Sequence, residues 1–418
     1  MNILIKSATI LDSTSEYHNA TKDILIENGS ISKIDDNITN PDNYQEIALD
    51  NLHISIGWID TSVSFGEPGY EHRETIANGI KTAALSGFTS VCLNANTHPI
   101  IDTHSDVSFL KSKAQGKAVN ILPIGALTRQ SKGVDLAEMY DMKQAGAVAF
   151  GDYQHAVDNA NLLKISLQYA QNSESLVLSF PMDTQIKGKG IVNEEVSATR
   201  LGLKGIAALA EELHIARDLQ ILEYTGGKLH IPTISSEKSV ELIAEAKKKG
   251  LDISCSVAVH NLVLTDDVLE TFETNYKVMP PLRTRKDRQA LLKGVQDGTI
   301  DYVTSDHNPI DIELKKIEFD HAEYGTIGLE SAFGALNSIL DTEKVIDCLT
   351  RKSERFGHKN ESIKEGIQAN LSLFNPEGEY VFNKEHIHSK SHNSAFLGMT
   401  LKGKVYGIIN NNQVIIGE

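Results

Sequence analysis

Strands and helices alternate through the middle of the chain, about residues 56–362, and this alternation constrains the fold more than any other feature. Short runs rich in β-branched residues predict strands at 88–93, 119–124, 147–150, 175–180, 228–234, 252–257 and 301–304. Helical patterns lie between them, at 74–86, 135–145, 159–171, 205–221 and 237–249. Gly87, Gly146 and Gly250 follow three of these helices, where C-terminal caps belong. The alternation predicts a parallel β/α barrel, with a doubly wound sheet as the alternative.

Both ends of the chain have a different texture, made of short strands and turns. Residues 1–55 contain Asn28-Gly29 between two apolar runs, which is a strong hairpin signal. The C-terminal stretch repeats the pattern, with a turn at 410–412. We therefore predict two domains: a barrel over 56–362, and a small β-sandwich formed by residues 1–55 together with 363–418.

Charge and cysteine usage exclude several functional classes. The formal charge of −16 argues against a surface for nucleic acid or anionic membranes, because both require clustered Lys and Arg. No apolar run approaches the 18 residues of a membrane span. Three scattered cysteines, Cys92, Cys255 and Cys348, form no disulfide framework and favour a cytoplasmic location.

The first barrel strand ends in the sequence GWIDTSVSFGEPG, residues 57–69. Alternate residues of a strand point to one face, so Asp60, Ser62 and Ser64 are predicted to project together. The C-terminal ends of barrel strands are where chemistry takes place in this fold. A neutral hydroxyl is a poor ligand for zinc, which prefers imidazole, thiolate or carboxylate.

Several segments together resemble the bacterial type I dihydroorotases of the amidohydrolase superfamily. They are GWID, EPGYEHRETIANGIKTAALSGFTSV, LPIGALT, LAEMYDMKQAGAVAFGD, HIARD, TGGKLHI, MPPLR, TSDHNP and GTIGLESAF. The resemblance extends over nearly the whole chain. It implies a distorted (β/α)8 TIM barrel of amidohydrolase type, and a family that uses zinc to close carbamoyl aspartate to dihydroorotate in pyrimidine biosynthesis.

The metal ligands that the resemblance implies are mostly missing. Four positions that hold histidine in the family are Ser62, Ser64, Phe180 and Thr233 here, which leaves Asp152 and Asp306 as residual ligand positions. A catalytic zinc generally needs three protein ligands, mostly imidazoles. We therefore expect no metal and no cofactor.

Other family positions are partly kept. The resemblance makes Asp306 the family's general base, here vestigial, and assigns substrate contacts to Asn96, Arg283 and His260. The arginine and histidine that contact substrate are replaced by Gly66 and Ile310, and Met279 replaces a polar asparagine. His230 survives, and we interpret it, like His260, as a hydrogen-bonded barrel residue. Arg283 either meets an anion or forms a surface ion pair.

These observations leave three hypotheses about function. The first is a catalytically silent dihydroorotase homologue with a structural or regulatory role, either as a homo-oligomer or in a complex with aspartate transcarbamoylase, the partner that the resemblance implies. The second is an active cyclic amidohydrolase whose zinc site is rebuilt from Asp152, His155, His230, His260 or Asp306. The third is a non-catalytic binder of a pyrimidine-related anion. His386 and His388 form a His-x-His pair outside the barrel, which we interpret as a solvated loop.

Overall fold

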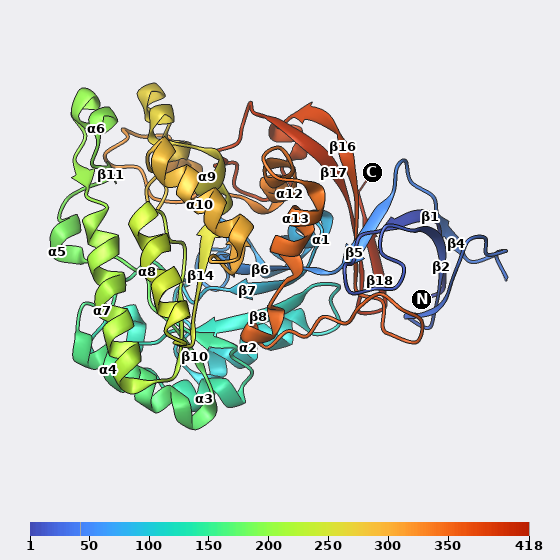
Figure 1. Cartoon of the computed structure of the whole chain (residues 1–418), viewed down its shortest axis with the longest axis horizontal. Coiled ribbons are helices and arrows are strands. Elements are labelled where there is room, and N and C mark those ends of the chain that lie inside the picture. The colour runs from blue at the N-terminus through green and yellow to red at the C-terminus, as the bar shows by residue number, and fades with distance from the viewer. Residues whose placement is uncertain (42, 418) are drawn as a thin grey trace.

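The central part of the chain forms a nearly closed barrel of eight parallel strands (Figure 1). The computed structural model describes residues 1–41 and 43–417. In order around the barrel the strands are β6 (Trp58–Val63), β7 (Phe88–Leu93), β8 (Asn120–Gly125), β9 (Ala149–Phe150), β10 (Leu176–Leu178), β13 (Lys228–Ile231), β14 (Ile253–Ala258) and β15 (Tyr302–Thr304). A bridge between Val63 and His307 brings the first and last strands together. This arrangement confirms the barrel and excludes the doubly wound alternative.

Helices surround the barrel. They are α1 (Ile76–Leu85), α2 (His104–Ala114), α3 (Met139–Gln144), α4 (Ala160–Ala170), α5 (Thr184–Lys187), α6 (Val196–Leu201), α7 (Leu209–Thr225), α8 (Glu237–Lys248), α9 (Val259–Val263), α10 (Arg285–Asp297), α11 (Ile312–Lys315), α12 (Leu329–Asn337) and α13 (Thr342–Thr350). The helix predicted at 205–221 begins later than expected, because residues 205–206 form β12 (Gly205–Ile206) beside β11 (Val192–Asn193). Across residues 1–41 and 43–417, no helix combines the length and apolarity needed to cross a membrane.

Two apolar layers hold the barrel together. The interior is filled by side chains from successive strands and a capping aromatic: Ile59, Cys92, Leu122, Ile124, Ala149, Leu176, Leu178, Tyr302 and Phe356. A larger core lies between the strands and the surrounding helices. Because the interior is packed with side chains, only the ends of the barrel are left for chemistry.

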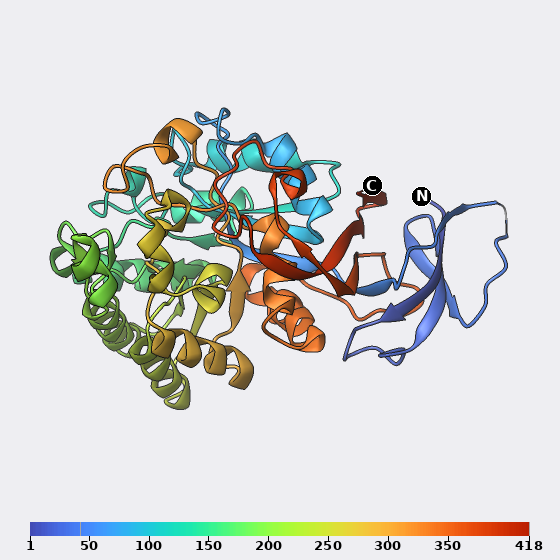
Figure 2. The same cartoon turned by 90° about the horizontal axis from the view of Figure 1, so that it is seen from above.

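Strands from both ends of the chain form one mixed sheet beside the barrel (Figure 2). Its strands are β1 (Ile3–Ile10), β2 (Thr21–Glu27), β3 (Ser30–Asp35), β4 (Gln45–Ile47), β5 (His53–Ile56), β16 (Leu371–Val381), β17 (Thr400–Asn410) and β18 (Gln413–Ile416). Asn28 and Gly29 both have positive φ in the predicted hairpin turn, as do Asn411 and Asn412 in the second turn. The pairing of β5 with both β1 and β16 joins the two ends of the chain, as predicted.

Candidate functional site

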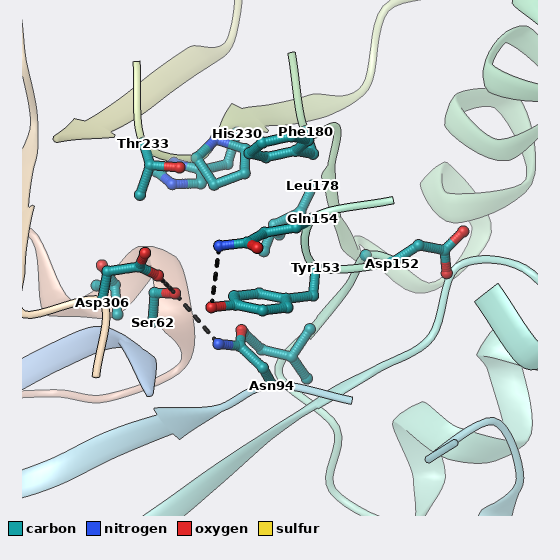
Figure 3. Close-up of a pocket in the computed structure, with 14 residues that line it drawn as sticks. Ser62, Asn94, Asp152, Tyr153, Gln154, Leu178, Phe180, His230, Thr233 and Asp306 are labelled. Atoms are coloured by element: carbon teal, nitrogen blue, oxygen red, sulfur yellow. Dashed lines mark hydrogen bonds between the residues drawn. The ribbon is translucent and has the colours of Figure 1, made fainter. Parts of the chain in front are cut away.

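A small cavity lies at the C-terminal ends of the barrel strands (Figure 3). Its lining includes Ser62, Asn94, Asp152, Tyr153, Gln154, Phe180, His230, Thr233 and Asp306. The volume open to the centres of water-sized molecules is about 20 Å³. This is about the space that one water molecule requires. The mouth of the barrel is therefore almost completely filled by side chains.

Tyr153 and Gln154 fill much of this space. Tyr153 follows β9 with a φ of 54°, and its side chain points toward Asp306 and Ser62 (Figure 3). The Gln154 side-chain amide donates to the Tyr153 hydroxyl at 3.2 Å and to the Met279 carbonyl at 2.9 Å. These two residues thus connect β9 to the loop that precedes α10. No sequence pattern singled out either residue, although an aromatic residue directly after a strand end was an available signal.

Asp306 is the carboxylate at the centre of the mouth. It is buried, and the Ser62 hydroxyl donates to its Oδ1 at 3.0 Å. Burial raises the pKa of Asp306 to about 7, and the nearby charge of Asp60 acts in the same direction, while Ser62 and Tyr153 oppose the shift. Asp306 is thus held among hydroxyl groups.

The two serines of the first strand form a neutral hydrogen-bond network. The Asn94 side-chain amide donates to the hydroxyls of Ser62 and Ser64, each at 3.2 Å. Asp60 accepts the Ser62 N–H at 3.1 Å, the Ser305 N–H at 2.9 Å and the Thr304 hydroxyl. The structure therefore brings Ser62 and Ser64 together, as the alternation predicted, but directs the Asp60 carboxylate to β15.

Asp152 lies at the cavity, but its carboxylate points away from Asp306 (Figure 3). It accepts the N–H groups of Leu127 and Thr128 at 2.9 and 3.0 Å, and also the Thr128 hydroxyl. Burial raises the pKa of Asp152. Because its oxygens are already occupied by the loop after β8, Asp152 does not form a pair with Asp306.

Phe180 and Thr233 close the opposite side of the mouth. Phe180 is buried in an apolar cluster with Met182, Ile206, Ala210 and Met279. Thr233 has a φ of 49°, which is unusual for a β-branched residue, and its N–H donates to the Ser256 hydroxyl at 3.1 Å. Neither residue offers a nitrogen or carboxylate ligand to the cavity.

The buried histidines near the mouth are neutral. His230 contacts the hydroxyls of Ser254 at 2.8 Å and Ser256 at 3.3 Å, and burial lowers its pKa to about 3. His307 accepts the Gly328 and Leu329 N–H groups through Nδ1, and burial lowers its pKa to about 4. His230 is therefore a hydrogen-bonded barrel residue, as predicted.

The three predicted substrate contacts, Asn96, Arg283 and His260, are not among the residues that line the cavity. Arg283 is buried, not on the surface: it lies 3.7 Å from Glu211 and donates to Ser235 at 3.0 Å. His260 is fully buried with a pKa lowered to about 3, and neither ring nitrogen has a partner within the described part of the chain, so the interpretation of His260 as a hydrogen-bonded residue was wrong. The expectation of a surface ion pair for Arg283 was wrong, because the segments at 190–211 cover this side of the barrel.

The loops around Gly66 and Ile310 pack closely against these two residues. A Cβ atom at Gly66 would lie 1.9 Å from the Tyr70 carbonyl oxygen, so no side chain fits at this position without moving the backbone. Ile310 is buried, and its N–H donates to Asn393 at 3.1 Å. The loops have thus closed around Gly66 and Ile310, the two positions that the resemblance assigns to substrate contacts.

The donor set does not fit a zinc ion. In residues 1–41 and 43–417 there is no group of three or more His, Cys, Asp or Glu side chains placed to hold a metal. Of the residues considered for a rebuilt site, His155 is exposed and His260 lies outside the cavity lining. Asp152 and His230 are occupied by the hydrogen bonds described above. Asp306 alone remains directed into the mouth.

The fold defines an amidohydrolase-type barrel. It matches L-hydantoinase from Arthrobacter aurescens with a TM-score of 0.86 at 21% identity, covering 100% of this chain and 97% of that one. It also matches dihydropyrimidinase from Brevibacillus agri with a TM-score of 0.82 at 20% identity, covering 100% and 95%. At these identities the likeness concerns the fold.

Sequence comparison establishes the family. The family model described as dihydro-orotase-like matches residues 53–239. The dihydroorotase of Thermoanaerobacter sp. (strain X514) is 38% identical, over 97% of this chain and 95% of that protein. The dihydroorotase of Geotalea daltonii is 37% identical over 99% of both. The chain belongs to the dihydroorotase family, a family of pyrimidine biosynthesis.

Proposed function

We propose that this chain is a catalytically silent dihydroorotase homologue that acts as a structural or regulatory partner in pyrimidine biosynthesis. The observation that carries the proposal is the filled barrel mouth. Tyr153, Gln154 and Phe180 leave about 20 Å³, which cannot admit a molecule as large as carbamoyl aspartate. The cavity also offers little to a pyrimidine-related anion, because its lining contains no lysine or arginine and Asp306 is itself acidic.

The energetic cost of losing zinc supports the same proposal. Zinc lowers the pKa of its bound water from about 15.7 to about 7. At about 1.36 kcal/mol per pKa unit, this difference corresponds to about 12 kcal/mol for forming hydroxide at neutral pH. A general base such as Asp306 contributes about 10²- to 10⁴-fold, or about 3–5 kcal/mol. Asp306 alone therefore does not compensate for the missing metal.

Catalytic silence is tested by metal analysis of protein purified without chelators, together with an assay of dihydroorotate formation from carbamoyl aspartate. We expect less than one zinc per ten chains and no turnover above the rate without protein. A family member with intact histidines is the positive control. Stoichiometric zinc with turnover would establish the rebuilt-site hypothesis instead.

A partner role is supported by exposed apolar side chains on two packed helices, α4 and α7, which together we call the apolar stripe. They are Leu209, Leu213 and Tyr224 on α7, with the polar Arg217 and Gln220 between Leu213 and Tyr224, and Ile165 and Tyr169 on α4. Positions 209, 213 and 224 recur at helical spacing, so they lie on one face. We propose that this stripe contacts aspartate transcarbamoylase, and that the protein acts in the cytoplasm.

The partner proposal is tested by mixing the chain with purified transcarbamoylase from the same cell and measuring the mass of the complex. We expect a stable complex, and we expect Leu213→Asp with Tyr224→Ser to abolish it. Val134→Ser, another exposed apolar position away from the stripe, is the control and should leave the complex intact. A larger mass without the transcarbamoylase would identify a homo-oligomer instead.

A further inference from the structure

Two loops close together over one side of the barrel mouth. We call residues 266–284, after α9, the first lid loop, and residues 306–328, after β15, the second lid loop. Met279 of the first lid loop is buried in the same apolar cluster as Phe180, and Tyr324 of the second packs against that cluster. The two loops therefore cover the side of the mouth that Phe180 closes.

Each lid loop inserts a buried lysine into the other. Lys277 of the first loop and Lys315 of the second are both only 3% exposed. The Lys277 side chain donates to the carbonyls of Phe319 and Asp320 at 2.8 and 2.9 Å. The Lys315 side chain donates to the carbonyls of Thr274 and Lys277 at 3.0 and 3.3 Å. Because each lysine bonds to the backbone of the other loop, the pair links the two loops.

Further contacts join the loops at the same place. The Gly325 N–H donates to the Lys277 carbonyl at 3.0 Å. The Thr274 hydroxyl donates to the Lys315 carbonyl at 2.5 Å. The Lys277 nitrogen also lies 5.1 Å from the centroid of the Tyr324 ring, in reach of a cation–π contact. Separation of the loops would break these contacts together, so we expect the loops to open as one unit.

Within the described part of the chain, no negative group bonds to either lysine. The hydrogen-bond partners of both nitrogens are backbone carbonyls. A buried charge without a counter-charge is unfavourable. Burial lowers the pKa of Lys315 to about 7, and the charge of Lys277 acts in the same direction. Glu273 and Glu323 oppose this shift without cancelling it. The closed loops therefore favour the neutral form of Lys315.

Charged groups on other elements act on the same loops. Burial lowers the pKa of Lys277 as well, which Asp320 opposes and Lys187 of α5 reinforces. Outside the two loops, His72 Nε2 lies 3.9 Å from Asp311, just before α11. A protonated His72 would attract Asp311 and hold the loops closed in acid, so its effect is opposite in sign to that of Lys315. The effect of Lys315 is therefore measured best at neutral to alkaline pH.

We propose that the two loops form a lid that opens and closes as one unit, and that loss of a proton from Lys315 tightens this lid over the mouth. In the open lid Lys315 is in water, where it keeps its proton to a higher pH than in the closed lid. Opening therefore takes up a proton above about pH 7, so the open fraction grows as the pH falls toward this value. Below it Lys315 is protonated in both forms, and the growth levels off. The lid does not depend on whether the chain is catalytically silent.

Hydrogen exchange at the Gly325 amide tests the lid, because this amide bonds to the Lys277 carbonyl across the two loops. Protection factors are compared, since they correct for the pH dependence of the chemical exchange rate. We expect protection at Gly325 to be about fiftyfold lower at pH 7 than at pH 9, and to fall only about twofold further at pH 6. The Val148 amide, which donates to the Pro123 carbonyl within the barrel, should change by less than about threefold.

Two results with the parent protein would overturn the proposal. The first is constant protection at Gly325 between pH 7 and pH 9, which would mean that opening takes up no proton. The second is an equal loss of protection at Gly325 and Val148, because the chain would then unfold as a whole and no separate lid would exist.

A matched pair of variants assigns the pH dependence to Lys315. Lys315→Met removes the titrating group and keeps the length of the side chain, so protection at Gly325 should no longer depend on pH. Lys316→Met removes a charge from the next residue, which is exposed, and should reproduce the parent within about twofold. If Lys315→Met keeps the pH dependence of the parent, another group titrates and the proposal is wrong.

A further variant keeps the test independent of whether Lys315→Met folds. Lys277→Met removes the positive neighbour of Lys315, so the pKa of Lys315 in the closed lid should rise. The pH at which protection at Gly325 levels off should then move upward. An unchanged levelling-off would contradict the coupling of the two lysines on which the proposal depends.

Discussion

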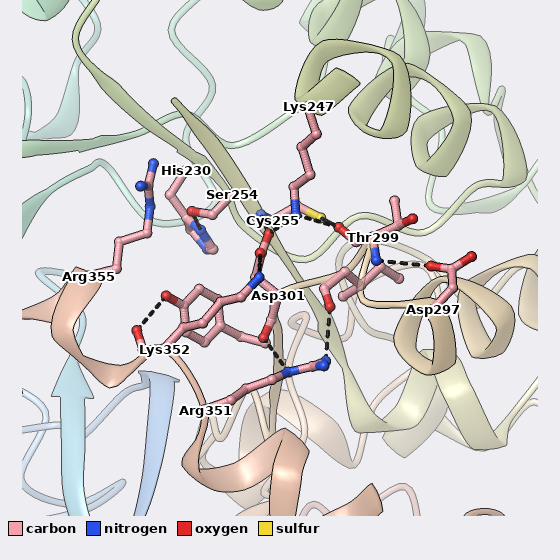
Figure 4. Close-up of polar contacts among 12 residues, drawn as sticks. His230, Lys247, Ser254, Cys255, Asp297, Thr299, Asp301, Arg351, Lys352 and Arg355 are labelled. Atoms are coloured by element: carbon pink, nitrogen blue, oxygen red, sulfur yellow. Dashed lines mark hydrogen bonds and ion pairs between the residues drawn. The ribbon is translucent and has the colours of Figure 1, made fainter. Parts of the chain in front are cut away.

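The two ends of the barrel differ in how their polar groups are satisfied. At the mouth, the groups around Asp306 are hydroxyls and amides, from Ser62, Ser64, Asn94 and Tyr153. At the base, charged groups meet directly (Figure 4). Asp301 contacts the ammonium groups of Lys247 at 2.6 Å and Lys352 at 2.5 Å. Among the described residues, the mouth supplies no positive partner for its carboxylate, whereas the base supplies two.

The pKa values of the two aspartates express this difference. Burial acts to raise both pKa values, but at Asp301 the charges of Lys247 and Lys352 outweigh it and the pKa is lowered. At Asp306 no such cation is present and the pKa rises to about 7. The base of a β/α barrel serves stability and the mouth serves chemistry. Here the stabilising end is intact, and the chemical end has been filled with neutral groups.

The largest expected effect is at the base, in Phe356→Ala. Phe356 is fully buried and contacts the rings of His230 and Tyr302 at 5.3 and 5.2 Å. Removing the ring leaves a cavity, so we expect a loss of about 3–5 kcal/mol in urea denaturation. Phe272→Ala, at a ring that is 47% exposed, should cost less than about 1 kcal/mol. If Phe180→Ala at the mouth costs more than Phe356→Ala, the mouth is the better packed end.

Asp301→Asn should cost about 2–4 kcal/mol at pH 7, because it leaves two lysines facing an uncharged group. The lowered pKa of Asp301 means that its ionised form stabilises the fold above the ordinary Asp pKa. This contribution disappears as the pH falls through the lowered pKa, so the difference between the two proteins should narrow toward low pH. Urea denaturation between pH 3 and pH 7 measures it. If the stability difference between the parent and the variant does not change with pH, the ion pairs of Asp301 with the two lysines do not stabilise the fold.

Asp306→Asn should have the opposite sign. The pKa of Asp306 is about 7 when folded, so between the unfolded value and pH 7 folding takes up a proton and stability falls as the pH rises. The asparagine variant avoids this loss and should be more stable than the parent by about 1–3 kcal/mol at pH 8. At pH 4 the two should differ little. If the free energy of unfolding of the parent instead exceeds that of the variant by a margin that grows toward pH 8, a positive group must face Asp306, which would contradict the structure.

The sequence predicts the fold well because the fold depends on local periodicity. Gly87, Gly146 and Gly250 all have positive φ after their helices, as their predicted capping role requires. The helix start near 205 was wrong, because pairing of Val192 with Gly205 across the chain formed a short strand that no local pattern signals.

The sequence does not predict what fills the site. The resemblance to the family implies that Ser62, Ser64, Phe180 and Thr233 replace metal ligands, which stays a prediction. The filling of the mouth by Tyr153 depends on its left-handed backbone, and Gln154 reaches a carbonyl 125 residues away. Arg283 likewise meets Glu211 inside the protein. Such directions and long-range contacts follow from the folded chain, so no spacing rule reveals them.

The smallest expected effect is at the mouth, in Ser64→Ala. Asn94 donates to both Ser62 and Ser64, so it keeps one acceptor when Ser64 is lost. We expect a loss of about 1 kcal/mol or less in urea denaturation. Asn94→Ala, which removes both hydrogen bonds, should cost more than Ser64→Ala. An equal cost for the two variants would show that Ser64 has a role beyond this network. A small graded loss would mean that the first-strand hydroxyls only satisfy Asn94 and Asp306, which is the role that a filled mouth leaves to them.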